Sequence, residues 1–179
     1  MARFALPTLG LVVILAACAT STRPQQWTAM VAPKAPLSFH DTLRGGIAVV
    51  EIVGGEKTDV LHASRGGDRE FADAVRGTLA NHGLLAAPED TGRYTLRVAL
   101  AAVEPPVGGF HTRVVSVIRY RLARAEDGTA VMDEVVATPG RATMKDTILA
   151  IRRMQFATEA AVRSNLGEFL ERLARFRPG

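Results

Sequence analysis

The side chains that most often carry catalysis or bind metals are few in this chain and lie far apart. There is one cysteine, Cys18, and there are four histidines: His40, His62, His82 and His111. No two histidines lie three or four residues apart, the spacing that places two ligands on one helical face. The acidic pair Asp133-Glu134 falls on a predicted strand, where adjacent side chains point to opposite faces. The sequence therefore predicts no catalytic residues, no metal site and no cofactor, and we expect a protein that is not an enzyme.

The composition favours one folded domain. Of the 179 residues, 47% are hydrophobic and 22% are charged, which argues against intrinsic disorder. One domain of this size can bury a core, and a lone cysteine excludes an internal disulfide framework.

That cysteine follows an apolar segment at the N-terminus. Arg3 is the only charge before it, and the run over 4–17 would span about 21 Å as a helix, short of the ~30 Å hydrocarbon core. This length is typical of an export signal. The residues Leu15-Ala16-Ala17-Cys18 resemble the lipobox of bacterial lipoproteins. The resemblance implies that residues 1–17 are a signal peptide and that Cys18 is lipidated; a plain signal peptide with a chance cysteine is the alternative.

The lipid anchor also implies a location. Each buried methylene contributes ~0.8 kcal/mol, so two or three acyl chains would hold the protein on a bilayer. Ala19 follows the cysteine, in place of the aspartate associated with inner-membrane retention in proteobacteria. By resemblance to that sorting pattern, we expect the periplasmic face of the outer membrane.

The mature chain divides into a tether and a domain. Residues 18–45 include Pro24, Pro33 and Pro36 and show little periodicity, which predicts a lipidated cysteine followed by a flexible tether. Residues 46–179 form the predicted single domain.

This domain begins with a strand and a helix. Residues 47–53 are a β-branched run between Gly-Gly pairs, which predicts a strand. Apolar residues then recur at i, i+4 and i+8, which predicts a helix over 69–82. Asp68 occupies the expected N-cap position. Gly83 suits the left-handed residue that ends a helix, with Leu84 folding back onto it.

Three strands and a second helix follow. Alternating apolar residues predict strands over 94–100 and 112–124. Asp127-Gly128 predicts a tight hairpin turn into a strand over 129–138. A two-residue turn would place Arg121 opposite Glu134, a favourable pair.

Pro139-Gly140 is expected to end the sheet, and apolar residues at spacings of four and three predict a helix over 155–176. Whether residues 146–154 extend this helix stays open. The fold class is therefore α+β: a two-layer sandwich in which a four-stranded, mostly antiparallel sheet carries two helices on one face.

Arginine dominates the basic residues, since only three of the 22 are lysines. Genomic base composition is one explanation, and phosphate binding is the other. Arg97, Arg119 and Arg121 fall on predicted strands and face away from the helices. They are candidates for binding anionic lipid or lipopolysaccharide, whereas nucleic acid is not an expected partner in the periplasm.

The whole pattern resembles small envelope lipoproteins of proteobacteria. The stretches that carry the resemblance lie within residues 46–176 and include Val50-Glu51-Ile52-Val53-Gly54-Gly55 and Tyr94-Thr95-Leu96-Arg97-Val98. They are similar to a largely uncharacterised alphaproteobacterial group, and the layout is similar to the lipopolysaccharide-assembly lipoprotein, although the Gly-Phe that usually follows its lipidated cysteine is missing. The resemblance implies binding to an envelope protein partner, or alternatively to lipid or lipopolysaccharide in an assembly or transport system.

Overall fold

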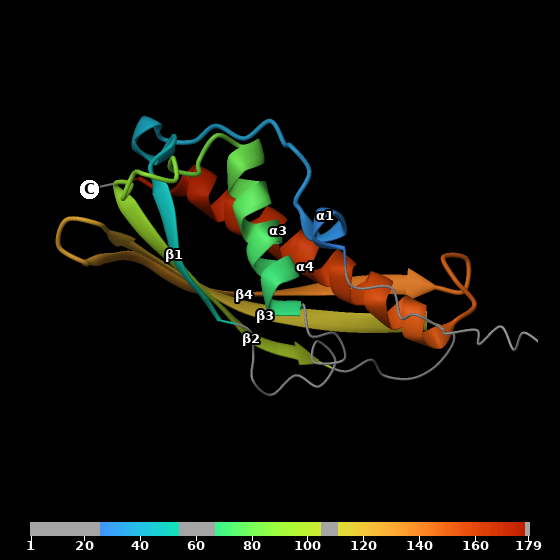
Figure 1. The fold of residues 1–179 in the computed structure, drawn as a ribbon. Helices are drawn as coiled ribbons and strands as arrows, with labels where there is room; N and C mark the ends of the chain where they lie inside the picture. Colours follow the sequence, from blue (N-terminus) through green and yellow to red (C-terminus); the bar gives the residue numbers. More distant parts are fainter. Residues whose placement is uncertain (1–25, 54–66, 105–110, 178–179) are drawn as a thin grey trace, which may run out of the picture.

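The computed structural model describes residues 26–53, 67–104 and 111–177. Four strands form one sheet in the order β1-β2-β3-β4, with β1 parallel to β2 and the other pairs antiparallel. The helices cover one face (Figure 1). The elements are α1 (Trp27–Met30), a short 3₁₀ helix (Asp41–Leu43), β1 (Ile47–Val53), α3 (Gly67–Asn81), β2 (Tyr94–Glu104), β3 (His111–Arg124), β4 (Ala130–Thr143) and α4 (Ala150–Arg175). The predicted α+β class and mostly antiparallel sheet are confirmed.

Alternation along the strands builds the core between the sheet and the helices. Tyr94, Leu96, Val98 and Leu100 of β2 are buried. The β3 residues opposite the last three, Leu122, Tyr120 and Ile118, are buried as well. Burying a side chain of this size stabilises a protein by ~1.5–3 kcal/mol. Opposite them, the helices present their apolar stripes: Phe71, Val75 and Leu79 on α3, and Val162, Leu166, Phe169 and Leu173 on α4.

The end of α3 matches the prediction. Gly83 has φ +66°, a conformation that costs glycine little. The Gly83 amide donates to the Ala80 carbonyl at 3.0 Å, and the Leu84 amide donates to the Leu79 carbonyl at 3.0 Å. These are the two bonds of a Schellman cap, and Leu84 is buried. The start of α3 differs from the prediction, because the helix begins at Gly67 and Asp68 therefore lies in its first turn and is not the N-cap.

The strand β4 does not end at Pro139-Gly140, as the sequence predicts, but continues to Thr143. Because β4 is an edge strand, a proline without an amide proton is tolerated there. A Cβ on Gly140 would collide with the backbone of Ala157 and Ala161 on α4. This glycine therefore belongs to the sheet, where it lets the helix approach closely.

The hairpin between β3 and β4 also differs from the prediction. Its loop has four residues, 125–128, because Arg124 and Thr129 still pair through a backbone bond of 2.9 Å. The Thr129 amide donates to Asp127 Oδ1 at 2.9 Å, which supports this longer turn. Together with a bulge beside Leu122, it shifts the register, so Arg121 faces Asp133 and not Glu134.

The helix α4 begins at Ala150, five residues before the predicted start. Residues 150–154 extend the helix, whereas 146–149 precede it. The short helix α1 has no counterpart in the prediction.

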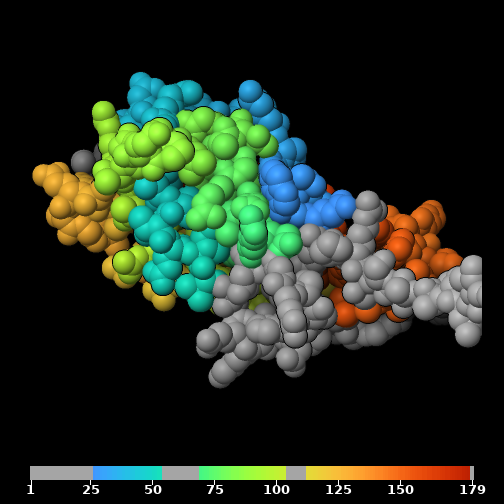
Figure 2. Space-filling model, viewed as in Figure 1, coloured from blue at the N-terminus to red at the C-terminus, as the bar shows by residue number. Residues whose placement is uncertain are grey.

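The residues before β1 are not a flexible tether over their whole predicted length. Met30, Ala32, Phe39 and Leu43 are buried in the core, and Figure 2 shows the blue to teal segment lying against green α3. The domain therefore already includes residues 26–45.

Side chains of α3 hold this segment in place. The Ala32 amide donates to Thr78 Oγ1 at 3.1 Å, and the Ala35 amide donates to His82 Nε2 at 3.2 Å. The other ring nitrogen of His82 bonds to the Thr78 carbonyl at 2.9 Å. Residues 26–45 show little hydrophobic periodicity. The sequence pattern therefore predicts a loop there and does not reveal that α3 holds it in place.

The predicted signal peptide, Cys18 and the first part of the tether lie outside the described residues. Among the helices of the described ranges, none has both the length and the hydropathy of a transmembrane segment.

Candidate interaction surface

The side of the sheet opposite the helices, here called the outer face, carries a row of charges. Glu51, Arg97, Arg121 and Asp133 lie side by side across the four strands, because each is in register with the next. The sequence predicts this orientation for Arg97, Arg119 and Arg121, and all three are exposed on this face.

Two of these three arginines already have acidic partners. Arg97 Nε lies 3.4 Å from Glu51 Oε2. Arg119 binds Asp133 through two bonds, from Nε at 2.7 Å and from a terminal nitrogen at 2.8 Å. The hydrogen bond from Arg119 holds the pKa of Asp133 below its usual value. Arg121 forms no ion pair with another described residue.

Apolar residues occupy the outer face beyond this charged row. They form an apolar strip that crosses three strands. Its most exposed large side chain is Val135, at 55%, and the alanines beside it make the surface flat. The strip consists of Ala99 and Ala102 on β2, Val115 and Val117 on β3, and Val135, Ala137 and Pro139 on β4.

A second pair of arginines lies at the other end of the strip. Arg113 of β3 is directly opposite Arg141 of β4, and both side chains are exposed. Arg97 and Arg121 stand opposite each other in the same way. Like charges in directly facing positions destabilise a sheet. The outer face thus presents an apolar strip between two arginine pairs.

The sequence does not identify Pro139 and Arg141, because the predicted strand ends at residue 138. The predicted pairing of Arg121 with Glu134 also turns Val135 and Ala137 to the other face of the sheet, whereas Arg121 in fact faces Asp133. Exposed and buried residues alternate over 133–142 in the structure, but the residue types in this stretch show no matching alternation between apolar and polar. Pro139-Gly140 also argues against a strand, since both residues more often break strands.

Polar groups on the helix-covered side have structural roles. Asn165 of α4 donates to the carbonyls of Val136 and Ser116 at 2.8 and 3.1 Å, and the Tyr120 hydroxyl donates to Asn165 Oδ1 at 2.8 Å. Tyr120 also stacks on Phe169 at 4.0 Å. This buried cluster ties the middle of α4 to both β3 and β4.

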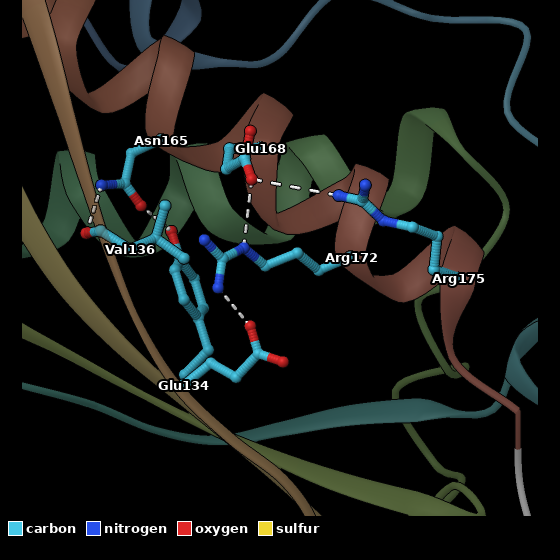
Figure 3. A network of polar contacts seen from close by, with 7 residues as sticks. Glu134, Val136, Asn165, Glu168, Arg172 and Arg175 are labelled. Atoms are coloured by element: carbon cyan, nitrogen blue, oxygen red, sulfur yellow. Dashed lines mark hydrogen bonds and ion pairs between the residues drawn. The ribbon is translucent and has the colours of Figure 1, made fainter.

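An ion-pair network extends the same contact toward solvent. Arg172 of α4 binds Glu134 of β4 and, at 3.2 Å, Glu168, which in turn lies 4.0 Å from Arg175 (Figure 3). The hydrogen bonds that Arg172 donates to Glu134 and Glu168 raise the pKa of its guanidinium. Each of the four side chains has at least one partner within the network, which fixes the helix to the sheet.

The histidines and acidic residues that could catalyse a reaction or bind a metal do not come together among the residues that the structure describes. In the described part of the chain, no three His, Cys, Asp or Glu side chains converge on a possible metal position. His82 is a buried structural residue, and His40 accepts from the Thr42 amide at 3.3 Å within the 3₁₀ turn. The side chains of His62 and His111 lie outside the described residues.

Comparisons with known proteins relate the chain to others through structure alone. No family model matches, and no curated protein matches. A Xanthomonas campestris protein aligns with a TM-score of 0.56 and 12% identity, over 80% of this chain and 94% of that one.

Two further solved structures are similar. The PelC dodecamer from Paraburkholderia phytofirmans aligns with a TM-score of 0.52 and 17% identity, over 76% of this chain and 93% of that one. A candidate lipoprotein from Caulobacter crescentus CB15 aligns with a TM-score of 0.48 and 18% identity, over 75% and 92%. At these identities, the two structures with TM-scores above 0.5 establish the fold alone.

Proposed function

We propose that this chain is a non-enzymatic lipoprotein, anchored through Cys18 to the periplasmic face of the outer membrane, that binds another protein of the cell envelope through its outer face. The anchor is supported by the order of signal segment, Leu15-Ala16-Ala17 and Cys18 in the sequence. The binding surface is supported by the apolar strip between two arginine pairs.

That arrangement has the anatomy of a protein interface. Interfaces place apolar residues at their centre and polar residues at their rim, and arginine is enriched in them. The small residues Ala99, Ala102 and Ala137 would let a partner approach the sheet closely. Because Arg113 faces Arg141, an acidic side chain of the partner would offset a repulsion that the free protein bears.

The alternative function is binding of lipid or lipopolysaccharide. Guanidinium groups match phosphate through two parallel bonds, and Arg113 and Arg141 are exposed with no ion pair to another described residue. The arginines predicted for this role are less available, since Arg97 and Arg119 already bind Glu51 and Asp133. Because two of the three arginines predicted to bind lipid are already engaged, we favour a protein partner over a lipid.

Metabolic labelling with radioactive palmitate tests the anchor. The wild-type chain should incorporate label, and the Cys18→Ser variant should not. A wild-type chain that is exported but never labelled would contradict the lipoprotein assignment.

Crosslinking in intact membranes tests the binding surface with the native anchor in place. We expect one protein to co-purify with the wild type and to be lost from the Ala137→Asp variant, which places a charge on the strip. Glu171→Asp, on the exposed face of α4, is the matched control and should retain the partner. Recovery of bound lipopolysaccharide without protein, lost on Arg113→Ala/Arg141→Ala, would instead support the alternative.

A further inference from the structure

Exposed apolar side chains gather at one end of the domain, where β4 leads into α4. Met144 is 45% exposed, Ile148 77%, Leu149 52% and Ile151 57%. We call these four residues the apolar tip. Figure 1 shows this connection projecting at the end of the molecule where α4 begins, away from the hairpin of β3 and β4. The tip lies outside both the core and the outer-face strip.

Specific bonds hold the tip in one conformation. Asp146 Oδ2 accepts from the Thr143 amide at 2.7 Å and from the Thr143 hydroxyl at 2.9 Å. Arg153 is buried, and its guanidinium donates to the carbonyls of Thr147 and Ile148 at 3.0 and 2.7 Å. Burying an arginine costs free energy unless it is hydrogen-bonded. The two bonds from Arg153 offset that cost and position the backbone that carries Ile148.

The surroundings of the tip are basic. Between residues 141 and 156 there are four cations and one anion, a formal balance of +3. Arg141, Lys145 and Arg152 are exposed, whereas the one acid, Asp146, is engaged with Thr143. Long basic side chains beside apolar ones suit an interface at which the apolar groups enter lipid and the cations stay with anionic headgroups.

The anchor emerges close to this end of the domain. The first described residue, Gln26, donates its amide to Glu159 of α4 at 3.1 Å. Glu159 is about 14 Å along the helix from Ala150 but about 24 Å from Arg175, at 1.5 Å per residue. The eight residues from Cys18 to Gln26 can span at most about 28 Å. A lipid on Cys18 therefore keeps the tip within reach of the membrane surface.

We propose that the apolar tip enters the headgroup region of the anionic bilayer that holds the acyl chains. The domain would then have two membrane contacts, the anchor and the tip, which fix its orientation and leave the outer face directed at a partner. This inference rests on the lipid anchor of the proposed function but not on the identity of the partner.

The experiment places an environment-sensitive probe on the acylated full chain in vesicles. Because Cys18 is the only native cysteine and is expected to be acylated, Ile148→Cys supplies a single thiol for a nitrobenzoxadiazole label. In vesicles of phosphatidylethanolamine and phosphatidylglycerol, we expect a blue-shifted emission and quenching by lipids with a nitroxide near the headgroup. The same label on Glu171→Cys, near the other end of α4, should show neither effect.

Two further variants separate the tip from general lipid contact. In the Ile148→Cys background, Leu149→Asp/Ile151→Asp should abolish the blue shift and the quenching. Val50→Asp should keep both, since Val50 is 53% exposed but lies on β1. Circular dichroism checks that each variant is folded.

The possible failures are distinguishable. A chain whose intact mass lacks acyl groups and which does not enter vesicles would overturn the proposed anchor and this orientation with it. An acylated, vesicle-bound chain whose label at 148 remains unquenched would overturn the tip alone. A label at 148 that is blue-shifted but not quenched by the nitroxide lipids, in a chain of doubled molecular mass, would show that a second copy covers the tip. This result would also overturn the proposal.

Discussion

On the helix-covered side of the sheet, the polar atoms of Asn165, Tyr120 and Ser116 bond to one another or to backbone carbonyls. On the outer face, by contrast, Arg97 stands opposite Arg121 and Arg113 opposite Arg141. A buried polar group without a partner costs ~1–3 kcal/mol, so these bonds within the cluster stabilise the domain. Glu51 and Asp133 flank the first of these arginine pairs, whereas Arg113 and Arg141 form no ion pair with a described residue and keep a repulsion that folding alone would not favour. We infer that the helix-covered side stabilises the domain and that the outer face recognises a partner.

The largest effect should come from the close contact between β4 and α4. Gly140→Val should lower the free energy of unfolding by ~3 kcal/mol, because its side chain would collide with the α4 backbone. Ala137→Val, on the same strand but on the outer face, should change it by less than about 0.5 kcal/mol. Urea unfolding followed by circular dichroism measures both. Equal losses would mean that the outer face is also packed against the protein itself.

The next effect should come from the buried amide. Asn165→Ala should cost ~2 kcal/mol, since it leaves the Tyr120 hydroxyl and two strand carbonyls without their partner. Ser164→Ala, the exposed neighbour on the same helix, is the control in the same denaturation series. A neutral Asn165→Ala would show that water or a rearranged side chain satisfies these groups.

Removing an arginine from the outer face should have the opposite sign. Arg113→Ala should leave stability unchanged or raise it by a few tenths of a kcal/mol, because the repulsion from Arg141 is relieved. Thermal unfolding at low salt gives the greatest sensitivity, since salt screens exposed charges. A clear loss of stability would indicate that Arg113 binds an acid within the protein.

The smallest effect concerns the ion pair of Arg119 and Asp133. Because the pKa of Asp133 is lowered in the folded state, its contribution is present above the unfolded value of about 3.9 and is lost as pH falls through the lowered pKa. Arg119→Ala should return the pKa of Asp133 toward its usual value, as followed by NMR of the side-chain carboxyl. An unchanged pKa would assign the shift to another group.

Most of the fold follows from patterns that the sequence displays. The alternation from Tyr94 to Leu100, the stripe on α3 and the cap at Gly83 are local, and all are present in the structure. The hairpin is different, because Asp127-Gly128 fits more than one turn. A preference for the charge pair of Arg121 and Glu134 selects the wrong register, whereas the bulge beside Leu122 sets the true one.

The features that sequence patterns miss depend on distant contacts. Pro139 and Gly140 stay in a strand because β4 is at an edge and α4 presses on it. Residues 26–45 join the domain because Thr78 and His82 bind their amides. The candidate site is therefore predicted only in part. The sequence indicates the orientation of Arg97, Arg119 and Arg121, but it indicates neither their acidic partners nor the pairing of Arg113 with Arg141.

If a partner protein covers the outer face, the helix side of the domain should remain free of it. A photo-crosslinking amino acid placed at Ala137 in the acylated chain, in living cells, tests this difference, with Glu171 as the matched position on the exposed side of α4. We predict one discrete crosslinked protein at Ala137 that is absent at Glu171. No crosslink at Ala137, or the same product at both positions, would contradict it.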